Sequence, residues 1–278
     1  MWIAIIGDKR TQILRLHFHR REEIIMKIGG NTVLITGGAT GIGLAMAGEF
    51  LKAGSEVIIC GRTDETLNQA KARLPSLHIK KCDVAKEAER EQLYEWAVAN
   101  FQNLNVLVNN AGIQRMIDFR KGTQDLLRHR AEDGEDEIGV NLKAPVYLTA
   151  LFTPHLMKQK EAAIINVSSG LAFYPMAPMP VYCATKAAVH TFCLTLRQQL
   201  EGTSVKVFEL IPPMVDTNLD KGARKARGQT YFGLSTAEFI KPAVKSFEND
   251  EYEIRVRDPK LSAMRGDHPG GSSQELKK

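Results

Sequence analysis

The chain has 278 residues, of which 44% are apolar and 25% are charged, with 22 glycines and 11 prolines. This is ordinary globular usage, which excludes disordered, collagen-like and coiled-coil chains. The net charge of +5 is mild and the basic residues form no long stripe, so we expect no nucleic-acid partner. No apolar run approaches the ~18 residues of a membrane helix, so we expect no membrane partner either.

Four cysteines stand apart, at positions 60, 82, 183 and 193. They form no Cys-x-x-Cys pair and no cluster with histidine at zinc-ligand spacing, so we expect no metal site. Free buried thiols are typical of a reducing compartment, which predicts a cytoplasmic protein.

The two ends of the chain differ in composition from the rest. Residues 1–25 place a short apolar segment before a basic, polar stretch, the reverse of a signal peptide. We expect them to form an extension outside the fold, with an amphipathic helix that docks or targets as the alternative. Residues 266–278 are polar and rich in glycine and serine, which predicts a disordered tail. The range 26–265 then forms one domain.

Short apolar runs alternate along the chain with segments of helical periodicity. The runs predict seven strands, at residues 32–36, 56–60, 77–81, 104–109, 163–168, 204–210 and 252–256. Several are nearly continuously apolar, as strands buried on both faces of a parallel sheet are. Helical periodicity is clear at residues 65–74 and 87–101. This alternation predicts an α/β fold, a doubly wound and mainly parallel sheet with helices on both faces.

A glycine-rich turn follows the first predicted strand and opens a predicted helix. Glycine allows positive φ and close approach of the backbone to a ligand. The N-terminus of the following helix offers N–H groups and a partial positive charge to a pyrophosphate. The turn therefore predicts a dinucleotide site of the Rossmann type, made by Gly37, Thr40, Gly41, Ile42 and Gly43. A purely structural glycine turn is the alternative.

Tyr182 and Lys186 stand four residues apart in a predicted helix, so their side chains share a face. A nearby ammonium lowers the pKa of a phenol, which makes Tyr182 a workable general acid/base. Ser169 ends a predicted strand, where α/β folds bind ligands, and can donate a hydrogen bond to a substrate oxygen. Side chains alternate along a strand, so we expect Ser168 to point away from Ser169. Without Ser169, the Tyr–Lys pair would be a common surface arrangement.

The order of these motifs resembles the short-chain dehydrogenase/reductase family, in its classical branch. The resemblance covers roughly residues 30–217 and rests on G-x-x-x-G-x-G at 37–43, CDV at 82–84, NNAG at 109–112, GVNL at 139–142, Ser169 and YCATK at 182–186. It implies a Rossmann-type enzyme that interconverts an alcohol and a carbonyl by hydride transfer with NAD(P)(H). The substrate, a small molecule, stays unidentified.

The resemblance also implies roles for individual residues. Asp83, Val84, Asn110 and Thr217 would bind the cofactor, together with Tyr182 and Lys186. Asn141 would complete the catalytic set by holding a water that links Lys186 to solvent. Family members usually pair through the long helices predicted here at 142–158 and 181–200, which implies a homodimer or homotetramer.

The residues after the second predicted strand bear on the choice of cofactor. An acidic residue there binds the ribose 2′-hydroxyl of NAD, whereas an arginine accommodates the 2′-phosphate of NADP. Gly61 takes the expected acidic position and Arg62 follows it. We therefore expect NADP(H), with NAD(H) as the alternative because Asp64 stands nearby.

Other segments depart from the family pattern or face the substrate. Pro213 replaces a usual glycine, which stiffens the loop before Thr217. This variant resembles a bacterial branch labelled D-alanylation-cluster oxidoreductases, a label that names no substrate. Residues 218–245 correspond to the family's substrate lid. Phe173, Met176 and Met179 either line an apolar pocket or pack as core. The acidic run 132–137 predicts a solvated helix start.

Two other functional classes fit parts of the sequence. One is a catalytically idle, nucleotide-sensing or regulatory member of the same fold. All four expected catalytic positions are occupied, which disfavours it. The other is a sugar-nucleotide epimerase or dehydratase of the extended branch. Members of that branch have a different glycine spacing and a larger C-terminal domain.

Overall fold

The structure is a computed structural model, and it describes residues 26–127, 136–219, 228–229 and 233–260. The expected extension at 1–25 and the tail at 266–278 lie outside the described residues. Seven parallel strands form one sheet in the order β3-β2-β1-β4-β5-β6-β7. They are β1 (Thr32–Thr36), β2 (Glu56–Gly61), β3 (His78–Lys81), β4 (Leu104–Asn109), β5 (Ala162–Val167), β6 (Val205–Ile211) and β7 (Glu253–Arg255). All seven predicted strands are confirmed.

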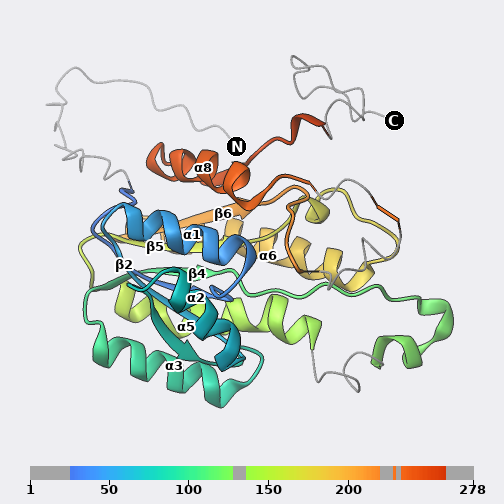
Figure 1. The fold of residues 1–278 in the computed structure, drawn as a ribbon, viewed down its shortest axis with the longest axis horizontal. Helices are drawn as coiled ribbons and strands as arrows, with labels where there is room; N and C mark the ends of the chain where they lie inside the picture. Colours follow the sequence, from blue (N-terminus) through green and yellow to red (C-terminus); the bar gives the residue numbers. More distant parts are fainter. Residues whose placement is uncertain (1–25, 128–135, 220–227, 230–232, 261–278) are drawn as a thin grey trace, which may run out of the picture.

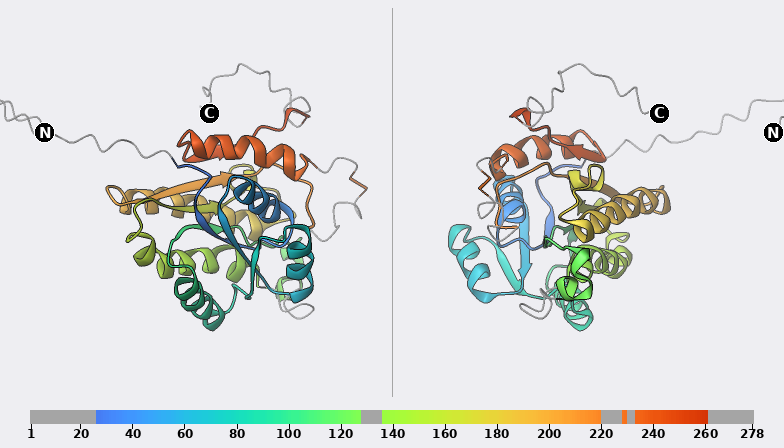
Figure 2. Two further views of the ribbon diagram at one scale, coloured as in Figure 1. Left: turned by 60° about the vertical axis from the view of Figure 1, so that its left-hand side comes forward. Right: turned by 90° about the vertical axis from the view of Figure 1, so that its right-hand side faces the viewer.

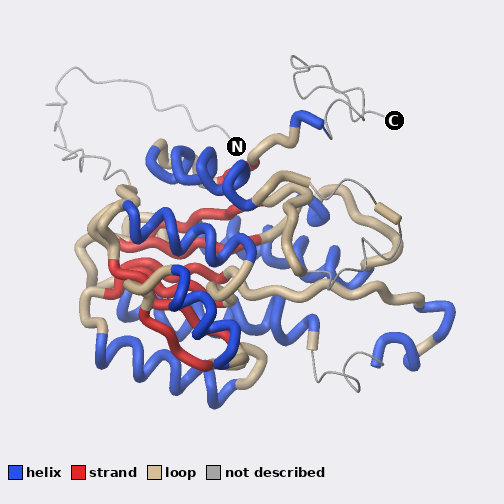
Figure 3. The backbone as a smooth tube through the Cα atoms, viewed as in Figure 1, coloured by secondary structure: helices blue, strands red, loops and turns tan. Residues whose placement is uncertain are grey.

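Helices cover both faces of this sheet, as the sequence predicts (Figures 1 and 3). One face carries α1 (Gly41–Lys52), α2 (Asp64–Arg73) and α8 (Thr236–Glu248). The other face carries α3 (Glu87–Asn100), α5 (Ala144–Leu156) and α6 (Pro180–Gln199). The helices predicted at 65–74 and 87–101 correspond to α2 and α3. The chain therefore forms a three-layer, doubly wound domain of the Rossmann type.

The five inner strands are mostly apolar because both of their faces are covered, whereas the edge strands β3 and β7 are polar and partly exposed. Val33 and Ile35 of β1 point into the core beneath α1 and α8, and Leu34 between them points into the core on the side of α3 and α5. All five residues of β1 are buried. Such strands show no alternation of apolar and polar residues.

The last helix belongs to the core rather than to a lid. In α8, Phe239, Ile240 and Ala243 are buried in the same cluster as α1 residues, and the rotated views show α8 beside α1 on one face of the sheet (Figure 2). The predicted lid range, 218–245, therefore runs into a core helix. Residues 220–227 and 230–232 of that range lie outside the described part of the chain.

The strand order reverses at β1, where the chain winds outward first toward β3 and later toward β7. In sheets of this kind, the crevice at the carboxyl ends of the two central strands binds ligands. The segments that follow β1, β4, β5 and β6 meet at this edge. No helix among the described residues has the length and apolar character needed to cross a lipid bilayer.

Candidate active site

The predicted glycine turn joins β1 to α1 at this edge. Gly37 and Gly41 have φ angles of 64° and 55°, which residues with a side chain rarely adopt. The N–H of Gly37 donates to the carbonyl of Cys60 over 2.9 Å, which ties the turn to β2. Thr40 is the N-cap of α1, and its side chain makes no capping hydrogen bond. The first N–H groups of α1 are therefore left to bind an anion such as a phosphate.

Residues from two other loops hold the turn in place. The side-chain amide of Asn110, after β4, donates to the carbonyls of Thr36 and Gly37 over 2.9 and 3.1 Å. A Cβ added at Gly41 would lie 3.2 Å from the side chain of Thr217, so the segment after β6 reaches the turn. The structure thus brings Gly37, Thr40, Gly41, Ile42, Gly43, Asn110 and Thr217 together. Cβ atoms added at these glycines would fill the cradle that the turn forms. Without them, the cradle fits the pyrophosphate of a dinucleotide.

The end of β2 carries the residues that we expect to distinguish NADP from NAD. Arg62 is exposed and follows β2 directly. The carboxylate of Asp64, the first residue of α2, lies 2.7 Å from Nζ of Lys81 at the end of β3. Both side chains of this pair are exposed, so the pair is weak. Asp64 nevertheless has a cationic partner within the protein.

Asp83 and Val84 follow β3 at the same edge of the sheet. The Asp83 carboxylate accepts a hydrogen bond from the N–H of Ala85 over 3.1 Å. Val84 is buried, and its carbonyl accepts from the guanidinium of Arg90 over 2.8 Å. The turn that carries Asp83 and Val84 is therefore held by hydrogen bonds of the Asp83 and Arg90 side chains.

The predicted catalytic residues meet where β5 ends and α6 begins. Tyr182 and Lys186 lie one turn apart on α6 and are 5% and 4% exposed. The Lys186 ammonium lies 5.7 Å from the centroid of the Tyr182 ring and donates to the carbonyl of Val167 over 2.7 Å. Ser169 is the N-cap of η3 (Gly170–Ala172), and its hydroxyl accepts from the N–H of Leu171.

Burial shifts the pKa values of Tyr182 and Lys186. It raises the pKa of Tyr182 to about 12, while a hydrogen bond with Ser169 acts in the opposite direction. It also lowers the pKa of Lys186 to about 8. In the protein without cofactor, burial of the phenol outweighs the lowering by Ser169, so the lowering expected from Lys186 does not dominate the pKa of Tyr182. At neutral pH, Tyr182 carries its proton.

The two neighbouring serines have different partners, as predicted. Ser168 donates its hydroxyl hydrogen to the carboxylate of Glu209 over 2.5 Å. Ser169 instead faces Tyr182. Their opposite directions follow from the extended backbone at the end of β5.

Asn141 lies in η2 (Gly139–Lys143), a π-helical turn directly before α5. Its side chain accepts from the N–H of Ile113 over 2.9 Å and donates to the carbonyl of Ile113 over 2.8 Å. It also donates to the hydroxyl of Thr185 over 3.3 Å. The side chain therefore joins the segment after β4 to α6, and π-helical turns are frequent at functional sites.

Glu137 lies next to this group and was missed by the sequence analysis. It is 7% exposed, so the prediction of a solvated acidic run is wrong at this position. Its carboxylate accepts from the N–H of Arg115 over 3.2 Å. Burial raises the pKa of Glu137 to about 7. A signal was present, because Glu137 precedes Asn141 by one helical turn and shares its face.

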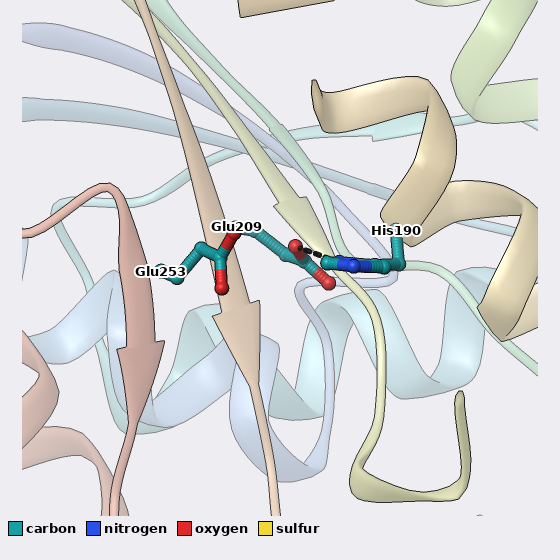
Figure 4. Close-up of side chains that lie close together, drawn as sticks. All are labelled: His190, Glu209 and Glu253. Atoms are coloured by element: carbon teal, nitrogen blue, oxygen red, sulfur yellow. Dashed lines mark hydrogen bonds and ion pairs between the residues drawn. The ribbon is translucent and has the colours of Figure 1, made fainter. Parts of the chain in front are cut away.

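His190, Glu209 and Glu253 form a second polar cluster (Figure 4). Nδ1 of His190, on α6, lies 2.7 Å from the Glu209 carboxylate on β6, which is fully buried. Glu253 on β7 completes a cluster whose ligand atoms all lie within 4.8 Å of one another. Glu209 already has hydrogen bonds to His190 and Ser168, which satisfies its buried charge without a metal ion. The network instead links α6, β5 and β6 beneath the catalytic residues.

The three candidate pocket residues of the loop after β5 have separate surroundings. Met179 is buried in a small cluster with Tyr182 and Cys183. Met176 is exposed. Phe173 packs edge-on against His190 and beneath the guanidinium of Arg255. Met179 is therefore the one of the three that borders the catalytic tyrosine.

The segment after β4 runs beside this loop. The N–H of Ile117 donates to the carbonyl of Pro178 over 3.0 Å, and the Gln114 amide donates to Sδ of Met179. Met116 and Tyr174 are exposed on the two segments.

Comparison with known proteins agrees with this architecture. The short chain dehydrogenase family matches residues 31–228, most of the chain. The chain belongs to this family of Rossmann-fold oxidoreductases.

Individual relatives show which members of the family this chain resembles. The uncharacterized oxidoreductase DltE of Bacillus subtilis is 57% identical over 229 residues, which cover 82% of this chain and 89% of DltE. The NADP-dependent 3-hydroxy acid dehydrogenase YdfG of Escherichia coli K12 is 35% identical over 184 residues, covering 66% of this chain and 72% of YdfG. The likeness to DltE supports assignment to the D-alanylation-cluster branch, which the proline at position 213 also indicates.

Solved structures give the same assignment. A closed form of serine dehydrogenase complexed with NADP+ has a TM-score of 0.65 and 33% identity, covering 74% of this chain and 84% of that chain. Serine dehydrogenase from Escherichia coli has a TM-score of 0.68 and 29% identity, covering 83% and 98%.

Proposed function

We propose that the chain catalyses reversible, NADP(H)-dependent interconversion of an alcohol and a carbonyl. One observation carries the proposal: Tyr182, Lys186 and Ser169 converge at the carboxyl edge of the sheet, where the glycine turn also lies. The bound nicotinamide would supply or accept the hydride. The idle alternative has no support, since every group that the chemistry needs is present.

In the direction of reduction, Tyr182 gives its proton to the substrate oxygen. Its raised pKa suits this role, because the phenol is protonated at neutral pH. Ser169 donates a hydrogen bond to the same oxygen, where negative charge develops. Lys186 holds the ribose and stabilises the phenolate left on Tyr182. In the direction of oxidation, Tyr182 takes the proton from the alcohol.

Asn141 completes this set. Its side chain is engaged with Ile113 and Thr185, so the water that links Lys186 to solvent would be held by the backbone of η2. Asp83 and Val84 would border the adenine end of the cofactor, and Asn110 would hold the glycine turn. Thr217 would contact the nicotinamide side of the cofactor.

The relatives suggest which substrates to assay first. One is named a 3-hydroxy acid dehydrogenase and another a serine dehydrogenase. We propose small hydroxy acids, L-serine among them, as the first class to test. The four free, buried thiols fit the reducing cytoplasm, and exposed Tyr147 on α5 and Leu194 on α6 fit a homo-oligomer built through these helices.

A cofactor titration tests the proposal. Binding of NADPH and of NADH is measured by calorimetry on the purified protein and on Arg62→Ala. Loss of a charge-assisted phosphate contact should weaken NADPH binding by roughly 10- to 100-fold and leave NADH binding unchanged. Arg73→Ala is the matched control, because it removes an exposed arginine from the other end of α2.

Two outcomes contradict the proposal in different ways. Preferential binding of NADH would indicate that Asp64, rather than Arg62, contacts the ribose of the cofactor. Binding of neither dinucleotide would remove the enzymatic assignment and leave the regulatory alternative.

A further inference from the structure

Lys186 is a buried cation whose hydrogen bond goes to a neutral carbonyl. Nζ donates to Val167, and 4% of the residue is exposed. A buried ammonium loses its proton readily unless an opposite charge lies near it. The proposed reaction uses the charged form, so a balancing carboxylate is expected close to Lys186.

Glu137 has the properties of such a carboxylate. Oε1 accepts from the N–H of Arg115, while Oε2 is buried and has no hydrogen-bond partner among the described residues. Buried polar atoms in native proteins are nearly always paired, so an unpaired carboxylate oxygen calls for an explanation. Burial disfavours the charged form of this carboxylate, which points to a use for its charge.

The position of Glu137 in the fold directs this charge toward the catalytic lysine. Glu137 and Asn141 share a helix face, and both hold the backbone of the segment 113–115. A Cβ added at Gly112 would lie 3.5 Å from Oδ1 of Asn141 and 3.7 Å from Nζ of Lys186. The helix face that carries Glu137 therefore borders the space around Lys186.

Among the residues that the structure describes, the titratable and charged groups around Glu137 and Lys186 are Arg115 after β4, Asp136 beside Glu137, and Tyr182, Cys183 and Cys193 on α6. Of these, Arg115 and Lys186 favour the charged form of Glu137, and burial opposes it. In return, the charge of Glu137 raises the pKa of Lys186, as Cys193 does to a larger extent, and it also raises the pKa of Tyr182. It favours the protonated form of both catalytic groups.

We propose that Glu137 is the counter-charge of the catalytic lysine, a positioning residue that keeps Lys186 an ammonium and Tyr182 a phenol. Its effect is to favour carbonyl reduction, in which Tyr182 gives away a proton. This catalytic meaning rests on the proposed function. The electrostatic coupling itself is a property of the protein without substrate or cofactor.

Nuclear magnetic resonance measures this coupling directly. The protein is labelled at the side-chain carbons of lysine, and the Cε signal of Lys186 is identified by its absence in Lys186→Met. The pKa of Lys186 is then read from the signal across the pH range around 8. In Glu137→Gln, we expect the pKa of Lys186 to fall by roughly half a unit or more, because a buried negative charge that raises it is removed.

Glu161→Gln is the matched control. It removes an exposed carboxylate at the start of β5, whereas Lys186 contacts the last residue of that strand. The control should leave the Lys186 pKa unchanged. Equal pKa values in Glu137→Gln and in the control would overturn the proposal.

The reciprocal measurement covers the case in which Glu137→Gln does not fold. Coupling between two sites is mutual, so Lys186→Met should raise the pKa of Glu137, read from its carboxyl carbon in protein labelled at the side-chain carbons of glutamate. An unchanged Glu137 pKa would equally overturn the proposal.

Activity supplies the last readout once a carbonyl substrate is known. The pH above which reduction declines should shift downward in Glu137→Gln by a similar amount. Because the resonance measurements need no substrate, they test the coupling even if the proposed function fails.

Discussion

Burial gives Tyr182 and Lys186 opposite departures from their ordinary ionisation. The phenol holds its proton more tightly and the ammonium holds its proton less tightly, because both charged forms lose contact with water. The two shifts together leave a neutral tyrosine next to a lysine that is close to its own titration at neutral pH. This arrangement suits proton donation to a carbonyl oxygen.

Removing the tyrosine hydroxyl should therefore abolish the chemistry without abolishing cofactor binding. We expect Tyr182→Phe to lower kcat for carbonyl reduction by roughly 10²- to 10⁴-fold, the usual contribution of a general acid. NADPH affinity, measured by calorimetry on the same sample, should change little. A variant that keeps more than half of the wild-type kcat would remove Tyr182 from the proton transfer.

At the scale of elements, the glycine turn and α1 leave no room for side chains at particular positions. A Cβ at Gly43 would lie 2.5 Å from the amide of Asn110 and 2.6 Å from the carbonyl of Gly37. A Cβ at Gly48, in the same helix, would meet only the end of Leu74, at 3.8 Å. The two glycines differ because the first lies where the helix meets the turn.

These two positions form a matched pair of substitutions. Gly43→Ala should weaken NADPH binding by at least about tenfold, because Asn110 and the turn must move apart to admit the methyl group. Gly48→Ala should bind normally and be slightly more stable, since alanine favours the helix. Equal affinities in the two variants would show that the turn does not hold the cofactor.

The contact between α8 and α1 stabilises the fold from outside the active site. Phe239 of α8 is fully buried, in the cluster that includes Phe50 of α1. Phe239→Ala should lower the free energy of unfolding by about 3–5 kcal/mol, through lost burial and the cavity that remains. Urea unfolding measures this change, and saturating NADPH should recover part of it by mass action. A loss below about 1 kcal/mol would assign this helix to a mobile lid.

At the scale of the whole molecule, the buried ionisable groups make stability depend on pH. The pKa of Glu137 is raised from 4.5 to about 7, so between these values the folded chain keeps a proton that the unfolded chain has released. Raising the pH through this window therefore destabilises the protein. Lys186 acts in the other direction: its pKa falls from 10.5 to about 8, so its burial costs stability below this window, and the cost declines as the pH rises through it.

A single substitution isolates the contribution of Glu137. Relative to Glu137→Gln, the wild type should lose roughly 2 kcal/mol of stability as the pH rises from about 5 to about 7.5. Urea titrations at several pH values measure the difference between the two proteins. Curves that stay parallel across this range would mean that Glu137 titrates normally.

The sequence by itself determined the elements and their chemistry. Short apolar runs predicted all seven strands, and several of these runs are nearly continuously apolar, as strands buried on both faces are. The glycines and the Tyr–Lys pair were readable because turn geometry and helical spacing are local properties.

Only the tertiary structure decided which polar groups are buried together. The position of Glu137 in an acidic run predicted solvent exposure, yet packing of η2 against the segment after β4 buries it beside Arg115. The partners of Glu209 lie on different elements, far away in the sequence. Likewise, the pKa of Tyr182 depends on how much water the fold removes, which helical spacing does not record.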